Sequence, residues 1–149
     1  MEPESSMNRR FPSPFGKIES TQLAVVLSRY SVAAFVLWAL LLLAQGALIG
    51  GGAHAEAAST MAFLVLQAIL AFAAAGFVLR KPNRILPAFG LAWSLYELSS
   101  VLVGLMLGAP MAIGGLPAWM GSLSTGVLMV CAILHIGGLR GAMALGRLS

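Results

Sequence analysis

Four long apolar runs, separated by short segments rich in glycine, proline or charged residues, constrain this chain more than any other feature of its sequence. The runs cover residues 32–49, 61–79, 85–107 and 118–139. A helix that crosses a bilayer needs roughly 17–25 mainly apolar residues, because the hydrocarbon core is about 30 Å thick and a helix rises about 1.5 Å per residue. Each run meets this requirement. The sequence therefore predicts an all-α membrane protein with a bundle of four transmembrane helices.

The composition agrees with lipid as the main solvent of the folded chain. Of the 149 residues, 59% are hydrophobic and only 9% are charged, whereas about a quarter of the residues of a typical soluble domain are charged. We expect a cytoplasmic tail over residues 1–22, disordered or lying on the membrane surface, and one transmembrane domain over residues 23–149. The tail prediction rests on three prolines, on Arg9-Arg10 and on the lack of a helical apolar period in this segment.

The basic residues all fall on one side of this four-helix arrangement. They are Arg9, Arg10, Lys17, Arg29, Arg80, Lys81, Arg84, Arg140 and Arg147. The two loops on the opposite side contain no lysine or arginine. Cytoplasmic loops carry an excess of Lys and Arg, so the pattern predicts that both termini are cytoplasmic (N-in/C-in). Abundant Ala, Gly and Leu, with Arg favoured over Lys, is compatible with a bacterial source, and we therefore expect a bacterial inner membrane protein.

A cleaved signal peptide is the alternative to the first transmembrane helix. Ala53-His54-Ala55 resembles a signal-peptidase site and Arg9-Arg10 resembles a twin-arginine export signal, and cleavage would leave three spans. The apolar run 32–49, however, exceeds the roughly 7–15 residues of a signal-peptide core, and the twin arginines lie far upstream of it. We therefore favour retention of the first helix.

Each predicted helix also carries a polar side chain at a similar depth in the membrane. The residues are Gln45, Gln67, Glu97 and Ser124-Thr125. Counting from the basic end of each helix at about 1.5 Å per residue gives depths of roughly 18–22 Å, which agree within the error of predicted helix ends. The pattern predicts one polar layer inside the bundle, to which all four helices contribute.

Small residues share helical faces with two of these polar side chains. Gly90 and Gly104 lie on the face of Glu97, and Ala71 lies on the face of Gln67. Small residues let transmembrane helices approach closely, so we expect these faces to pack against protein while Leu, Val and Phe meet lipid. Two GxxxG patterns, 46–50 and 104–108, point in the same direction without naming a partner.

Glu97 is the only acidic residue well inside the predicted hydrocarbon region. Desolvation disfavours the ionised carboxyl, so we expect it to hold its proton at neutral pH. Two interpretations stay open. The carboxyl binds a cation or exchanges a proton during transport, or it hydrogen-bonds Gln67 or Gln45 and holds helices together, worth about 0.6–2 kcal/mol per bond. The neighbouring Trp93 and Tyr96 either line a pocket for an apolar cation or fill space, and we favour packing.

His135 and Cys131 are secondary candidates on the fourth run. They are four residues apart, on a face shared with Ser124 and Gly138. A Cys–His dyad, a metal site or a haem ligand is conceivable, but a metal site normally needs three or four protein ligands and no other ligand is expected at this depth. We therefore favour a packed helix face with an interfacial histidine, and we interpret Cys131 as a small core residue.

The sequence contains no nucleotide-binding glycine loop, zinc-protease helix or GxSxG elbow. We therefore expect a non-enzymatic binding or assembly subunit, without a metal or other cofactor, that packs with itself or with a larger membrane complex. A small proton- or cation-linked carrier centred on Glu97 is the alternative. The bilayer is the expected partner, because basic residues at the ends of apolar runs suit lipid headgroups better than nucleic acid.

Overall fold

The computed structural model describes residues 13–18, 20–50, 55–107 and 116–148, and within these residues the secondary structure is entirely helical. The helices are α1 (Thr21–Ser28), α2 (Tyr30–Gly50), α3 (Ala55–Arg80), α4 (Ile85–Met106) and α5 (Ala118–Leu148). Four segments are long and apolar enough to cross a membrane: Thr21–Ile49, Ala57–Arg80, Ile85–Met106 and Ala118–Arg147. The prediction of four apolar helices of membrane-spanning length is confirmed.

The first and last of these segments are longer than the apolar runs 32–49 and 118–139 indicated. α1 begins at Thr21, inside the segment assigned to the tail, because the Ser20 hydroxyl caps the helix by accepting a hydrogen bond of 3.2 Å from the Leu23 backbone N–H. Arg29 separates α1 from α2 at a local turn. Sequence reasoning missed α1 because Arg29 interrupts the apolar run, although an arginine at a helix break can extend to the headgroups.

Residues 13–18 lie against α5. The Arg140 guanidinium donates hydrogen bonds to the Pro14 carbonyl and, at 2.9 Å, to the Gly16 carbonyl. Residues 1–12 lie outside the described residues, so a disordered or surface-lying tail stays a prediction for them.

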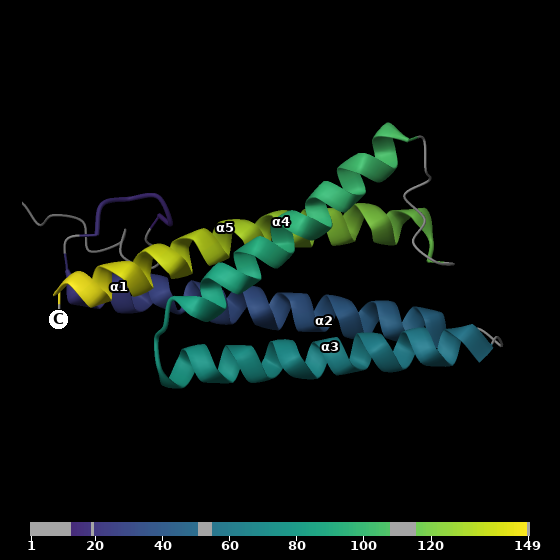
Figure 1. Cartoon of the computed structure of the whole chain (residues 1–149), viewed down its shortest axis with the longest axis horizontal. Coiled ribbons are helices and arrows are strands. Elements are labelled where there is room, and N and C mark those ends of the chain that lie inside the picture. The colour runs from purple at the N-terminus through teal and green to yellow at the C-terminus, as the bar shows by residue number, and fades with distance from the viewer. Residues whose placement is uncertain (1–12, 19, 51–54, 108–115, 149) are drawn as a thin grey trace, which may run out of the picture.

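α2 and α3 form an antiparallel pair, seen side by side in Figure 1. Their shared core joins Phe35, Ala39 and Leu42 of α2 to three alanines and one valine of α3: Ala68, Ala71, Ala75 and Val78. The alanines let the helices approach closely, which is how transmembrane helices gain packing energy when lipid is as apolar as their own side chains.

α5 crosses α1 and α2 at a glycine-lined contact. A Cβ atom at Gly141 would lie 2.7 Å from the Ala24 carbonyl oxygen, and one at Gly138 would lie 3.0 Å from the Ser31 backbone nitrogen. Real Cβ atoms do not tolerate such distances to another backbone, so only glycine fits at this crossing.

α4 departs from the bundle. Its first half packs on α5 through the buried residues Pro87, Gly90 and Ser94. Although α3 and α4 are joined by a short turn, they are scarcely in contact, and Figure 1 shows α4 crossing the other helices obliquely, with its far end away from α2 and α3. Only 11% of the residues in the apolar stretch of α4 are buried inside the protein, compared with 39% for the first and last membrane-spanning segments.

Candidate functional site

The polar side chains of α2 and α5 meet along the interface between these helices. The Gln45 Nε2 atom donates a 2.9 Å hydrogen bond to the Ser124 hydroxyl, which donates to the Met120 carbonyl at 2.7 Å. Both side chains are buried. A hydrogen bond between buried groups removes the cost of an unsatisfied polar atom in hydrocarbon, and it ties α2 to α5 at this depth.

Cys131 and His135 continue this polar seam toward the basic end of the bundle. The Cys131 thiol donates to the Ala34 carbonyl at 3.4 Å, and His135 Nδ1 lies 3.2 Å from the Ser31 hydroxyl. The imidazole is 1% exposed, and the Phe35 ring meets it edge-on at 4.6 Å. The predicted α5 face that carries Cys131 and His135 is thus the buried face.

Gly90 of α4 completes the surroundings of His135. A Cβ atom at Gly90 would come within 2.9 Å of His135 Nδ1 and closer still to Cε1 and Nε2 of the same ring. The histidine is therefore enclosed where α2, α4 and α5 meet. In the described part of the chain, no group of three or more His, Cys, Asp and Glu side chains is placed to hold a metal ion.

The four-helix polar layer is only partly assembled. Gln45 reaches Ser124, but neither the Gln67 amide nor the Glu97 carboxyl has a hydrogen-bond or ion-pair partner among the described residues. Glu97 is partly exposed on α4. The expected hydrogen bond from Glu97 to Gln67 or Gln45 is therefore not formed, because α4 leaves the bundle while Gln45 turns toward α5.

Unpaired polar groups collect on α4. The Trp93 indole Nε1 is buried, yet it has no hydrogen-bond partner in the described structure. Tyr96 is 63% exposed, and Ser99 and Ser100 turn their hydroxyls back to the Tyr96 carbonyl at 2.7 and 3.0 Å. The serines are thus satisfied within the helix, whereas the Trp93 and Glu97 side chains are not.

Aromatic side chains bridge α2 and α4. Trp93 stacks in a tilted arrangement between Trp38 and Tyr96, with ring centroids 5.9 Å apart in both pairs. Both centroid distances lie within the roughly 4.5–7 Å range of favourable aromatic pairs.

An apolar groove of about 450 Å³ opens between α3 and α4. α2 forms its floor with Phe35 and Trp38, and its walls include Leu70 of α3 and Phe89 of α4. Gln67 is the one amide in its lining, which does not include Glu97 or Tyr96. The groove thus separates two residues, Gln67 and Glu97, that the sequence pattern placed in one layer.

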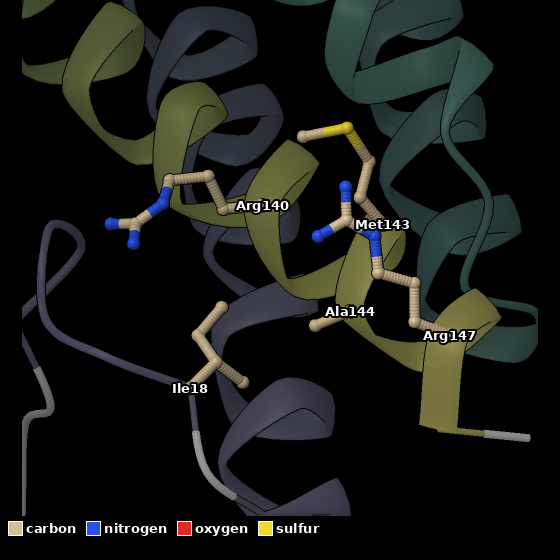
Figure 2. A pocket seen from close by; sticks show the side chains of 5 residues that line it. All are labelled: Ile18, Arg140, Met143, Ala144 and Arg147. Atoms are coloured by element: carbon tan, nitrogen blue, oxygen red, sulfur yellow. The ribbon is translucent and has the colours of Figure 1, made fainter.

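Basic side chains gather at the end of the bundle where α3 turns into α4 and α5 ends. Arg140, Arg147 and Ile18 line a cavity of about 290 Å³, and Figure 2 shows how these side chains lie around it. Arg84 lines a second cavity of about 550 Å³ together with Gly146 of α5. This arrangement agrees with the clustering of cations at one end that the sequence indicated.

Sequence reasoning placed Gly138 on the packed face of the last run, but it missed three other residues that build the crossing of α1 and α2 with α5: Ser28, Ser31 and Gly141. Ser28 and Ser31 are at most 1% exposed, and Gly141 lies against Ser28 and Gly138 against Ser31. Gly138 and Gly141 are three residues apart, a spacing that places them on one helix face, but Gly141 lies beyond residue 139, the predicted end of the last run.

Comparison with protein-family models, with curated proteins and with solved structures finds no match to this chain.

Proposed function

We propose that this chain is a non-enzymatic assembly subunit of a membrane complex, and that the outer half of α4, residues 96–106, binds a transmembrane helix of a neighbouring subunit. The observation that carries the proposal is the Glu97 carboxyl. It lies about 18 Å along the helix from Ile85, on a helix that is mostly exposed, and it has no partner in the described part of the chain.

An unpaired carboxyl at this depth is costly. Acidic residues within transmembrane segments generally pair with one another, with backbone carbonyls or with water-filled cavities, because hydrocarbon offers no hydrogen bonds. Since the chain's own helices leave Glu97 unpaired, a neighbouring helix supplies the missing partner. Tyr96 adds an exposed phenol to the same helix, and this group can join such a contact.

The shape of α4 also suits a helix partner. Ser100 and Gly104 are small residues four apart on its outer half, and both are at least partly exposed. Small residues spaced in this way allow a second helix to approach within backbone contact. The carrier that forms the alternative is less well supported, because Glu97 does not line the groove between α3 and α4.

We further place both termini on the cytoplasmic side of a bacterial inner membrane, since Arg80, Arg84, Arg140 and Arg147 lie at one end of the helices. Alkaline-phosphatase fusions at the C-terminus test this orientation, and an active fusion there would reverse it.

Photo-crosslinking in native membranes tests the assembly. Benzoylphenylalanine at Tyr96 should yield a crosslink to protein, whereas the same probe at Phe72, an exposed position of α3, should yield none. The mass of the adduct distinguishes a second copy from a different subunit. Lipid adducts alone at both positions would contradict the proposal.

Two substitutions of Glu97, each combined with the photo-crosslinking probe, test whether the carboxyl contributes to association. Glu97→Leu removes the hydrogen bond and should weaken association by about 0.6–2 kcal/mol, or roughly threefold to thirtyfold. Glu97→Gln keeps a donor and an acceptor, and most of the crosslink should survive. A proton-linked carrier predicts the reverse: an unchanged crosslink in both variants and loss of transport in Glu97→Gln.

A further inference from the structure

The groove between α3 and α4 lies inside the membrane-spanning part of the chain and is open to the surrounding bilayer. Its lining runs from Phe63 to Ala74 along α3, which corresponds to about 16 Å at the rise of an α-helix. That length is close to half of the roughly 30 Å hydrocarbon thickness, which is about the length that one acyl chain spans. Its walls are almost wholly apolar, with Gln67 as the exception.

The volume of the groove distinguishes between possible occupants. A transmembrane helix is about 10 Å across, so it would contact a groove of about 450 Å³ with the side chains of one face only. A single extended hydrocarbon chain is thinner than a helix and finds apolar contacts on three sides, from α2, α3 and α4.

The groove ends beside a concentration of positive charge. Leu86 lines it only two residues after Arg84, and Ala74 lines it six residues before Arg80, or roughly 3 Å and 9 Å along the respective helices. Arg80 and Lys81 are both exposed, and no ion pair joins either of them to an acidic side chain in the described part of the chain. An anionic group at the turn between α3 and α4 would meet uncompensated cations.

We propose that this groove is a binding site for an anionic phospholipid, with one acyl chain between α3 and α4 and the phosphate at Arg80 and Lys81. Charge complementarity favours this occupant over a neutral lipid, because each Lys or Arg near a membrane surface contributes about fivefold to the affinity for an anionic headgroup. The site uses the first half of α4, so it is separate from the outer half of α4 to which we assign subunit assembly.

Tryptophan quenching by brominated lipid gives a direct readout, because Trp38 and Trp93 both line the groove. The full chain carrying Trp119→Phe, which removes the tryptophan at the start of α5, is reconstituted into vesicles. Brominated phosphatidylglycerol and brominated phosphatidylcholine are compared at equal mole fraction. We expect half-maximal quenching at a mole fraction of phosphatidylglycerol at least about fivefold lower, the factor that one nearby cation supplies.

Charge variants locate the headgroup. Arg80→Gln/Lys81→Gln should bring phosphatidylglycerol to the level of phosphatidylcholine. Arg29→Gln/Arg147→Gln removes the same charge from two exposed positions outside the groove lining, and it should leave the preference intact. A preference that survives the first pair, or that both pairs abolish equally, would overturn the assignment to the turn between α3 and α4.

A second matched pair locates the acyl chain. Ala74→Phe fills the groove, whereas Ala73→Phe adds the same ring at the adjacent exposed position, outside the lining. Only Ala74→Phe should reduce quenching of Trp38 and Trp93. Equal quenching by the two lipids would mean ordinary annular lipid, and an absence of quenching by either would mean that protein covers the groove. Either result would overturn the proposal. Unchanged quenching of the tryptophans in the Ala74→Phe variant would also overturn it.

Discussion

Where α5 crosses α1 and α2, glycine lies directly against backbone and every polar side chain of the α2–α5 seam described above has a partner, from Gln45 with Ser124 to His135 with Ser31. The outer half of α4 carries polar groups at similar depth, but it has no such neighbour, and Glu97 stays unpaired in the described part of the chain. Polar side chains at similar depth are thus hydrogen-bonded within the described part of the chain in one region, whereas in the other Glu97 is not. This unpaired carboxyl is the basis of the proposal that a neighbouring helix binds α4.

The first half of α4 stands between these extremes. Gly90 and Ser94 are buried against α5, and the Ser94 hydroxyl donates to the Gly90 carbonyl at 2.9 Å. The opposite face of the same turns lines the groove toward α3. α4 is therefore held at one end by close packing on α5 and is free to diverge at the other.

The largest expected difference between the regions comes from truncating matched leucines. Leu41→Ala, at the α2–α5 interface beside Met120, should lower the free energy of unfolding by about 2–4 kcal/mol because it leaves a cavity. Leu102→Ala, at a position 57% exposed on α4, should change it by less than about 0.5 kcal/mol. Unfolding of the purified protein in mixed micelles by SDS, followed by circular dichroism, measures both. Equal losses would show that the outer half of α4 is packed within the single chain.

A smaller effect is expected from adding one methyl group to a glycine. At Gly141 the new Cβ would overlap the backbone of α1, whereas at Gly126 it meets nothing within 4 Å. Overpacking costs about 1–3 kcal/mol, and alanine returns up to about 1 kcal/mol of helix propensity. In the same unfolding assay, Gly141→Ala should destabilise by about 1–2 kcal/mol and Gly126→Ala should be neutral or stabilising. Similar changes in the free energy of unfolding for both variants would contradict a close backbone contact at Gly141.

The smallest effect is expected from deleting hydroxyl groups. Ser124→Ala breaks the bond from Gln45, and a double-mutant cycle with Gln45→Leu should give a coupling of about 0.6 kcal/mol and no more than about 1.7 kcal/mol. Tyr96→Phe removes a hydroxyl from the open region and should leave the free energy of unfolding of the isolated chain within about 0.5 kcal/mol of wild type. A coupling near zero for the first pair would mean that Gln45 and Ser124 are neighbours without energetic consequence.

Much of the fold follows from local pattern, because the length of an apolar run and the rise of a helix depend on neighbouring residues alone. Four spans and the shared face of Cys131 and His135 could be predicted in this way. The start of the first span at Thr21 was not predicted, because Arg29 interrupts the apolar run, and α1 packs mainly on α5, a segment far away in the chain.

The candidate site was predicted only in part. Gln45, Gln67 and Glu97 were expected in one layer because depth along a helix can be counted from sequence. Whether residues at equal depth meet depends on how each helix is rotated and on the angle at which helices cross, and these are decided by side-chain packing between segments far apart in the chain. Gln45 therefore hydrogen-bonds Ser124, whereas Gln67 lines the groove between α3 and α4.

By itself, the sequence determined that this chain is apolar enough for lipid to be its main solvent and that it forms four helices of membrane-spanning length. It also determined that the basic residues lie at one end of these helices. Only the tertiary structure decided that α5 binds α1 and α2 through glycine, that α4 diverges, and that Glu97 is left without a partner in the described residues. The physical reason is that hydrophobic length acts residue by residue, whereas close approach between helices depends on which small residues face each other across the bundle.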